Sequence, residues 1–145
     1  MMVHEASLQF RVVREGPVEA LDTPEKVAAY LAGAFDGDPT VEWFICIPLN
    51  RKNMPFGRVL ISKGTASSCL VNPREVLRPC ILSNASGFIA AHNHPSGDTA
   101  PSRADIQVTR ELREAGKTMG IPLIDHIIIG DAYSEPYSFN EAGLV

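Results

Sequence analysis

The stretch that most constrains this chain is residues 91–105, which reads AHNHPSGDTAPSRAD. An apolar run over residues 87–91 leads into it and has the composition of a buried strand. His92 and His94 stand one residue apart, so in an extended chain both imidazoles point to the same side. Pro95 ends the strand, and the turn-forming residues after it predict a loop.

A helix is expected to begin after this loop, with Ser102 as its N-cap and Asp105 on its first turn. That start can turn the Asp105 carboxylate back toward the two histidines. Two imidazoles and one carboxylate make three ligands for a borderline cation and leave one tetrahedral position open for water, as in catalytic zinc sites. Each piece also has an ordinary explanation. A His-x-His pair alone is a weak signal, and Ser-x-x-Asp is a capping-box pattern.

The remaining chain alternates between strand-like and helix-like segments. Runs rich in β-forming residues predict strands over residues 8–14, 41–49, 56–63, 121–129 and, at an edge, 132–139. The strands over 41–49 and 56–63 are expected to form an antiparallel hairpin.

Capping residues followed by proline predict helices over residues 24–35 and 73–84, with a kink or an early break at Pro79 in the second. A third helix is expected over residues 103–118, with Gly120 as its C-terminal stop. Strands interspersed with helices predict an α/β fold, in which a mixed sheet is flanked by helices.

The bulk properties narrow the class of protein. With 145 residues, we expect a single domain over residues 1–145. No apolar run approaches the roughly 20 residues of a membrane span, and no secretory signal is visible at the N-terminus. Three scattered cysteines suggest reduced thiols in a cytoplasmic protein. The net charge of −4 weighs against a general nucleic-acid-binding surface.

The motif reads His-x-His-Pro, then six residues, Ser, two residues and Asp, and it resembles the signature of the JAMM/MPN (JAB) metallopeptidase domain. The residues between these positions resemble the RadC-like branch of that family most closely. The similarity extends over residues 41–130. It implies the cytidine-deaminase-like three-layer sandwich of that family. It also implies one Zn²⁺ ion per chain, held by His92, His94 and Asp105, and a zinc metallopeptidase or isopeptidase activity.

Hydrolysis at such a site needs a proton acceptor, because Asp105 is used as a ligand. The resemblance assigns general acid/base catalysis to Glu42, which opens the strand over residues 41–49; otherwise Glu42 is a solvent-exposed strand end. Glu5, Glu15 and Glu19 match the family less well. The resemblance assigns stabilisation of the oxyanion to Ser102, a role compatible with an N-cap.

Two acidic residues near the motif have open roles. Asp98 is expected to be a turn residue. If strand alternation holds, either Asp125 or His126 faces the core, and Asp125 could accept a hydrogen bond from a metal-binding histidine or be a satisfied core or edge residue.

Other functions fit less well. A zinc nucleobase deaminase needs H-x-E and P-C-x-x-C, which are absent here. A non-catalytic interaction or regulatory module on the same scaffold would be expected to lose ligands. A DNA-repair role, historically linked to the RadC-like branch, fits poorly with the acidic charge. The substrate is expected to be a peptide, an isopeptide or a small amide.

Overall fold

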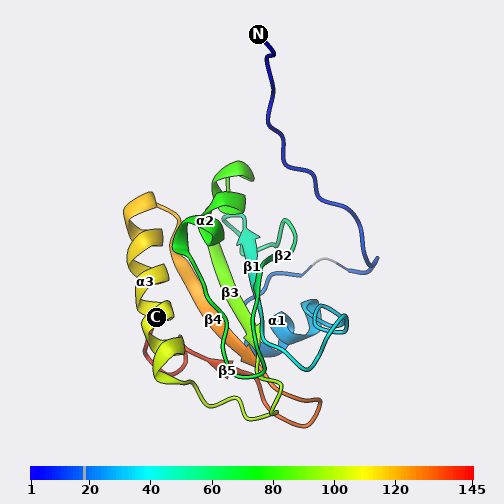
Figure 1. Cartoon of the computed structure of the whole chain (residues 1–145), viewed down its shortest axis with the longest axis vertical. Coiled ribbons are helices and arrows are strands. Elements are labelled where there is room, and N and C mark those ends of the chain that lie inside the picture. Colours follow the sequence, from blue (N-terminus) through cyan, green and yellow to red (C-terminus); the bar gives the residue numbers. More distant parts are fainter. Residues whose placement is uncertain (18) are drawn as a thin grey trace.

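The computed structural model describes residues 1–17 and 19–145. Its core is a five-stranded sheet in the order β2-β1-β3-β4-β5 (Figure 1). The strands are β1 (Trp43–Leu49), β2 (Val59–Lys63), β3 (Gly87–Asn93), β4 (Leu123–Ile129) and β5 (Tyr137–Ser138). The helices are α1 (Pro24–Tyr30), α2 (Pro73–Leu82) and α3 (Arg103–Met119). None of the helices in these residues is both long and apolar enough to cross a membrane.

The sheet is mixed, as expected. β1 pairs antiparallel with β2 and with β3, which confirms the predicted hairpin. β3 and β4 run parallel and are joined by α3, the type of crossover that a parallel pair requires. In the β1–β3 ladder Phe44 lies opposite His92, so the start of β1 lies beside the end of β3.

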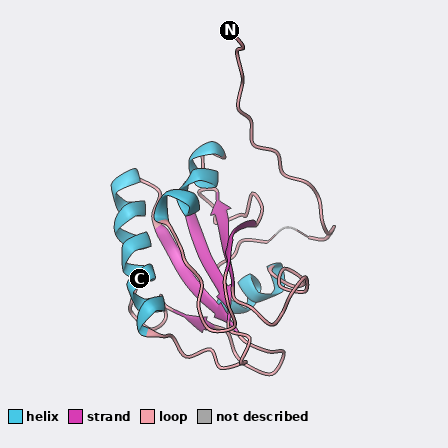
Figure 2. Cartoon of the chain, viewed as in Figure 1, coloured by secondary structure: helices cyan, strands magenta, loops and turns pink. Residues whose placement is uncertain are grey.

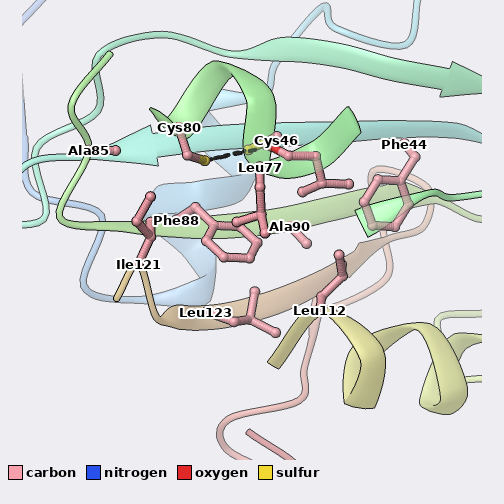
Figure 3. Packing of buried hydrophobic residues seen from close by; sticks show 11 residues of the cluster. Phe44, Cys46, Leu77, Cys80, Ala85, Phe88, Ala90, Leu112, Ile121 and Leu123 are labelled. Carbon is pink, nitrogen blue, oxygen red and sulfur yellow. Dashed lines mark hydrogen bonds between the residues drawn. The ribbon is translucent and has the colours of Figure 1, made fainter. Parts of the chain in front are cut away.

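Strand alternation divides the core into two layers, one on each face of the sheet. Side chains from one face pack with α2 and α3, and the fully buried Phe88 is among them (Figure 3). Side chains from the other face pack with α1 and include Ile47, Ile89 and Ile127. Helices therefore cover both faces (Figure 2), which gives the expected three-layer α/β arrangement.

The predicted helix starts are confirmed. Thr23 and Asn72 cap α1 and α2 with their side chains, and Pro24 and Pro73 occupy the first helical positions. Gly120 ends α3 in the left-handed conformation, at φ 69°.

Of the kink or early break expected at Pro79, the early break does not occur, because α2 continues through Pro79 to Leu82. Helix α1 is shorter than predicted and ends at Tyr30. The guanidinium groups of Arg14 and Arg58 donate hydrogen bonds to the Tyr30 carbonyl at 3.3 and 3.0 Å, so residues distant in sequence satisfy the helix end.

Two predicted strands differ from the structure. Residues 8–14 form no strand, and Val12 in this segment is 79% exposed. Its alternating apolar residues are not buried against the sheet, since Phe10 and Val13 are exposed as well, and the chain there is drawn as loop (Figure 2). At the other end of the chain, only Tyr137 and Ser138 of the run 132–139 join the sheet, directly after Pro136.

Candidate metal centre

The carboxyl end of β3 delivers the two histidines of the motif. His92 is on the ladder opposite Phe44 and is 2% exposed. The His94 N–H donates to the Ile129 carbonyl at 2.8 Å, so the chain stays extended for one residue beyond β3. Both imidazoles therefore point to the α3 side of the sheet, as the strand period predicts.

The start of α3 brings the carboxylate to these rings. The Ser102 hydroxyl oxygen accepts from the Asp105 N–H at 3.0 Å, and the Asp105 carboxylate accepts from the Ser102 N–H at 2.8 Å. This is a complete capping box. The cap bends the Asp105 side chain back over the helix end, so one geometry confirms the capping interpretation and also brings the carboxylate to the two imidazoles.

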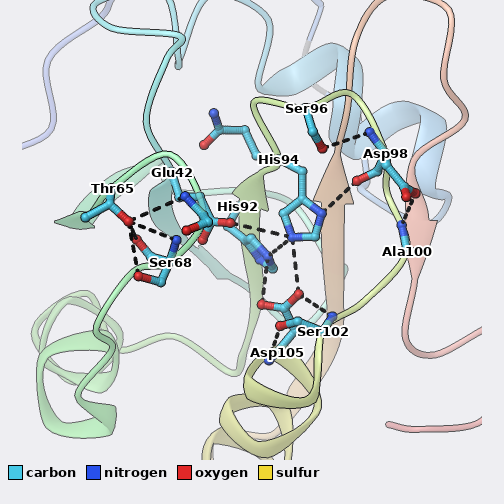
Figure 4. A network of polar contacts seen from close by, with 12 residues as sticks. Glu42, Thr65, Ser68, His92, His94, Ser96, Asp98, Ala100, Ser102 and Asp105 are labelled. Atoms are coloured by element: carbon cyan, nitrogen blue, oxygen red, sulfur yellow. Dashed lines mark hydrogen bonds and ion pairs between the residues drawn. The ribbon is translucent and has the colours of Figure 1, made fainter.

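Three possible ligand atoms meet at this point (Figure 4). The Nε2 atoms of His92 and His94 are 3.1 Å apart, and each is 3.2 Å from a carboxylate oxygen of Asp105. Nitrogen and oxygen ligands arranged tetrahedrally about 2.1 Å from a metal lie about 3.4 Å from one another. His92, His94 and Asp105 thus form a group that could hold one metal ion.

The chemistry of the donors also suits a cation. The His94 Nδ1 atom lies 2.8 Å from the Asp98 carbonyl, which can only accept, so Nδ1 carries a proton and Nε2 can offer its lone pair. Burial opposes ionisation of Asp105, but the adjacent imidazoles of His92 and His94 outweigh it and hold the pKa of the carboxyl well below its usual range. The hydrogen bond to Asp105 raises the pKa of His94, against the effect of burial.

Glu42 lies beside this group, immediately before β1. Its side chain is buried, and Oε1 is 3.9 Å from the His94 Nε2 atom. The antiparallel register explains the proximity, since Glu42 precedes Phe44 by two residues and His94 follows His92 by two. Burial raises the pKa of Glu42, while the two histidines act in the opposite direction.

Hydrogen bonds hold the Glu42 backbone on both sides. Its N–H donates to the Thr65 carbonyl and its carbonyl accepts from the Gly64 N–H, both at 2.8 Å. The Asn93 side chain accepts from the Trp43 N–H at 2.7 Å and donates to the Val41 carbonyl at 3.0 Å. Asn93, between the two histidines in sequence, therefore ties the segment around Glu42 to the end of β3.

A small cavity opens between these residues. Glu42, His92, Ser102 and Asp105 contribute polar groups to its lining, and Phe44 and Val108 contribute apolar ones. The Ser102 hydroxyl oxygen serves the helix cap as an acceptor, so its proton is available for donation.

The remaining acidic candidates have structural roles. Asp98 is a turn residue, as predicted, and its side chain accepts from the Ala100 N–H at 2.9 Å. Asp125 is a satisfied residue away from the ligand atoms, because its carboxylate accepts from the Ser138 hydroxyl at 2.6 Å and from the Asn140 N–H at 3.0 Å.

The residue that touches a motif histidine is instead His126, whose Nε2 atom lies 2.8 Å from the His92 Nδ1 atom. Thr109 contacts the other side of the His126 ring. Sequence reasoning missed both. The alternation of residues 123–129 marked Asp125 or His126 as core-facing, and only the parallel register with β3, which pairs Ala90 with His126, selects between them.

Comparisons with known proteins agree with this geometry. A family model described as RadC-like JAB domain matches residues 21–144. A UPF0758 protein of Geobacter sulfurreducens is 43% identical over 127 residues, which is 88% of this chain and 54% of the relative. A UPF0758 protein of Bacillus licheniformis is 46% identical over 108 residues, 74% of this chain and 48% of the relative.

A UPF0758 protein of Staphylococcus aureus is 45% identical, again over 74% of this chain and 49% of its own length. The chain thus spans about half the length of the curated relatives it matches. The family model nevertheless matches residues 21–144, which is most of this chain, so the shorter length does not affect that match. The chain belongs to the RadC-like JAB domain family.

Proposed function

We propose that this chain is a zinc-dependent hydrolase of the JAMM type that cleaves an amide or isopeptide bond. The observation that carries the proposal is the convergence of two imidazole Nε2 atoms, 3.1 Å apart and each 3.2 Å from one oxygen of the Asp105 carboxylate, beside the buried carboxylate of Glu42. The substrate would be a peptide, an isopeptide or a small amide.

His92, His94 and Asp105 would hold one zinc ion per chain. Two imidazole nitrogens and a carboxylate are a ligand set that zinc accepts in catalytic sites. When bound, zinc supplies Lewis-acid chemistry, because it polarises a carbonyl group and makes water acidic enough to lose a proton near neutral pH.

Glu42 would act as the general acid/base. Its carboxylate would take the proton of the attacking water and deliver it to the leaving amine nitrogen. Burial supports this role, because a carboxyl whose pKa is raised both accepts and returns a proton more readily near neutral pH. The paired backbone around Glu42 would keep the side chain at its distance from His94.

Ser102 would stabilise the oxyanion of the tetrahedral intermediate. Its hydroxyl lines the same cavity as Glu42, and the capping bond holds its oxygen in position while leaving the proton free. One preorganised donor of this kind typically contributes about 3 kcal/mol to lowering the barrier.

The first test is the metal content of the native protein by mass spectrometry, after zinc has been supplied and excess removed. We expect about one zinc per chain, lost in His92→Ala and in Asp105→Ala. His4→Ala is the matched control, because His4 is exposed near the N-terminus and outside the ligand group. A wild-type protein without bound zinc would refute the proposal.

The second test is hydrolysis of amide and isopeptide substrates by the zinc-loaded protein. Glu42→Gln keeps the size of the side chain but removes the proton acceptor, so the variant should retain zinc and lose turnover. Cleavage at the wild-type rate by that variant would contradict the assignment of Glu42.

A further inference from the structure

Three short contacts lead from His92 into the core behind the ligand group. His92 Nδ1 lies 2.8 Å from His126 Nε2, and His126 Nδ1 lies 2.7 Å from the Thr109 hydroxyl oxygen. The Thr109 hydroxyl donates to the Asp105 backbone carbonyl at 2.7 Å. His126 is fully buried and Thr109 is 1% exposed, so water does not compete for these bonds.

The direction of the protons follows from the last contact. A backbone carbonyl can only accept, so the single hydroxyl proton of Thr109 lies between Thr109 and Asp105. Thr109 therefore presents a lone pair to His126, and the His126 Nδ1 atom must carry a proton. The His126 ring is fully buried and its two nitrogens contact only His92 and Thr109, so no acidic side chain supports a second proton and the neutral ring has only that one.

A neutral His126 with its proton on Nδ1 has an acceptor at Nε2. The proton of the neighbouring contact consequently belongs to the His92 Nδ1 atom. A neutral His92 is then left with an unprotonated Nε2 atom, which is the atom that faces His94 and Asp105.

The reverse arrangement of protons along Thr109, His126 and His92 is less stable. It would place the Thr109 proton toward His126 and leave two buried oxygens 2.7 Å apart with no proton between them. The ring cannot readily turn to another arrangement, because Phe139 stacks on it at 4.6 Å between centroids and Phe44 meets it edge-on at 5.5 Å.

We infer that His126 is a positioning residue, which together with Thr109 keeps the His92 Nε2 atom unprotonated and aimed at the ligand group. This inference rests on the proposed function for its purpose, since the exposed lone pair serves a metal ion. Without the chain of bonds, His92 would also populate the tautomer with a proton on Nε2, donating to the Asp105 carboxylate 3.2 Å away. That proton would have to leave before a metal could bind.

The test combines two measurements on the full chain. Nitrogen-15 NMR of the histidine rings reads the tautomer in the metal-free protein at a pH where His92 is neutral, and competition with a chromophoric chelator gives zinc affinity. Thr109→Val replaces the hydroxyl by a methyl group of similar shape, and Thr109→Ser is the matched control that keeps the hydroxyl. His126→Leu removes the ring, and His126→Gln retains one acceptor and one donor.

In the wild type we expect a protonated Nδ1 and an unprotonated Nε2 on both His92 and His126. Thr109→Val should mix the two tautomers of His92 and weaken zinc binding by about 10–100-fold, the usual effect of losing a partner of a metal-binding histidine. Thr109→Ser should stay close to the wild type. His126→Gln should bind zinc more tightly than His126→Leu. Thermal unfolding of each metal-free variant identifies any that fails to fold.

A wild-type spectrum with the proton on the His92 Nε2 atom would overturn the inference. So would a folded Thr109→Val protein with unchanged tautomers and unchanged zinc affinity. These results are separable from failure of the proposed function: a wild-type protein that binds no zinc refutes the hydrolase, whereas its metal-free spectrum still decides the proton order along His92, His126 and Thr109.

Discussion

The affinity of the site for zinc should depend steeply on pH, with His94 as the controlling group. In the metal-free protein the Asp105 carboxylate lies 3.2 Å from the His94 Nε2 atom, and this hydrogen bond raises the pKa of His94 above 6.5, although burial opposes it. A proton and a zinc ion would compete for the same nitrogen. Lowering the pH therefore removes the lone pair that zinc needs.

The magnitude follows from the exchange of one proton for one ion. Where His94 is mostly protonated, each fall of one pH unit should weaken zinc binding about tenfold, which is about 1.4 kcal/mol. Because the pKa is raised, the decline should begin above pH 6.5. Folding stability depends on pH in the opposite direction. The raised pKa of His94 stabilises the metal-free fold below pH 6.5, and this stabilisation is lost as the pH rises through the folded-state pKa.

Chelator competition at several pH values between 5.5 and 8, with a chelator whose own protonation is known, measures this dependence. Asp105→Asn is the informative comparison, because it removes the group that raises the pKa of His94. Zinc binding by that variant should be weaker at every pH, and its decline should begin at a lower pH. A wild-type affinity that does not change across the range would refute the reasoning, as would an identical onset in the variant.

Three further predictions concern single residues. Glu42→Gln should keep its zinc and lose at least about a hundredfold in turnover, measured on any substrate that the wild type cleaves, and an unchanged rate would contradict the assignment. Ser102→Ala should lower the unfolding free energy of the metal-free protein by about 1 kcal/mol in urea denaturation, through loss of the cap, and an unchanged midpoint would argue against that bond. Gly116→Ala should cost about 1–3 kcal/mol in the same assay, because an added Cβ would lie 2.5 Å from the Ile121 carbonyl oxygen; a stability equal to wild type would show that α3 can move away.

Features encoded over a few residues could be predicted from the sequence. The two histidines share a face because strand side chains alternate, and Asp105 turns toward them because a capping box is a local structure. The caps at Thr23 and Asn72 and the hairpin of β1 and β2 are of the same kind. In each case, short stretches of neighbouring residues carry most of the information.

Glu42 was selected as a candidate only through the family resemblance. Fifty residues separate it from His92, and no local pattern reports which strand lies beside β3. The register that sets Phe44 opposite His92 results from the packing of the sheet, and that register brings Glu42 to His94.

The remaining features were decided by tertiary structure alone. Residues 8–14 alternate in sequence but form no strand, because the fold buries neither side of the segment against the sheet. Helix α1 ends at Tyr30, and Arg14 and Arg58, both distant in sequence, satisfy the carbonyl left free there. His126 and Thr109 come together behind His92 because α3 packs across β4. The sequence by itself determined which atoms could bind a metal, whereas the proton order along the His92–His126–Thr109 contacts depends on three elements meeting in the core, where each buried polar group needs a partner.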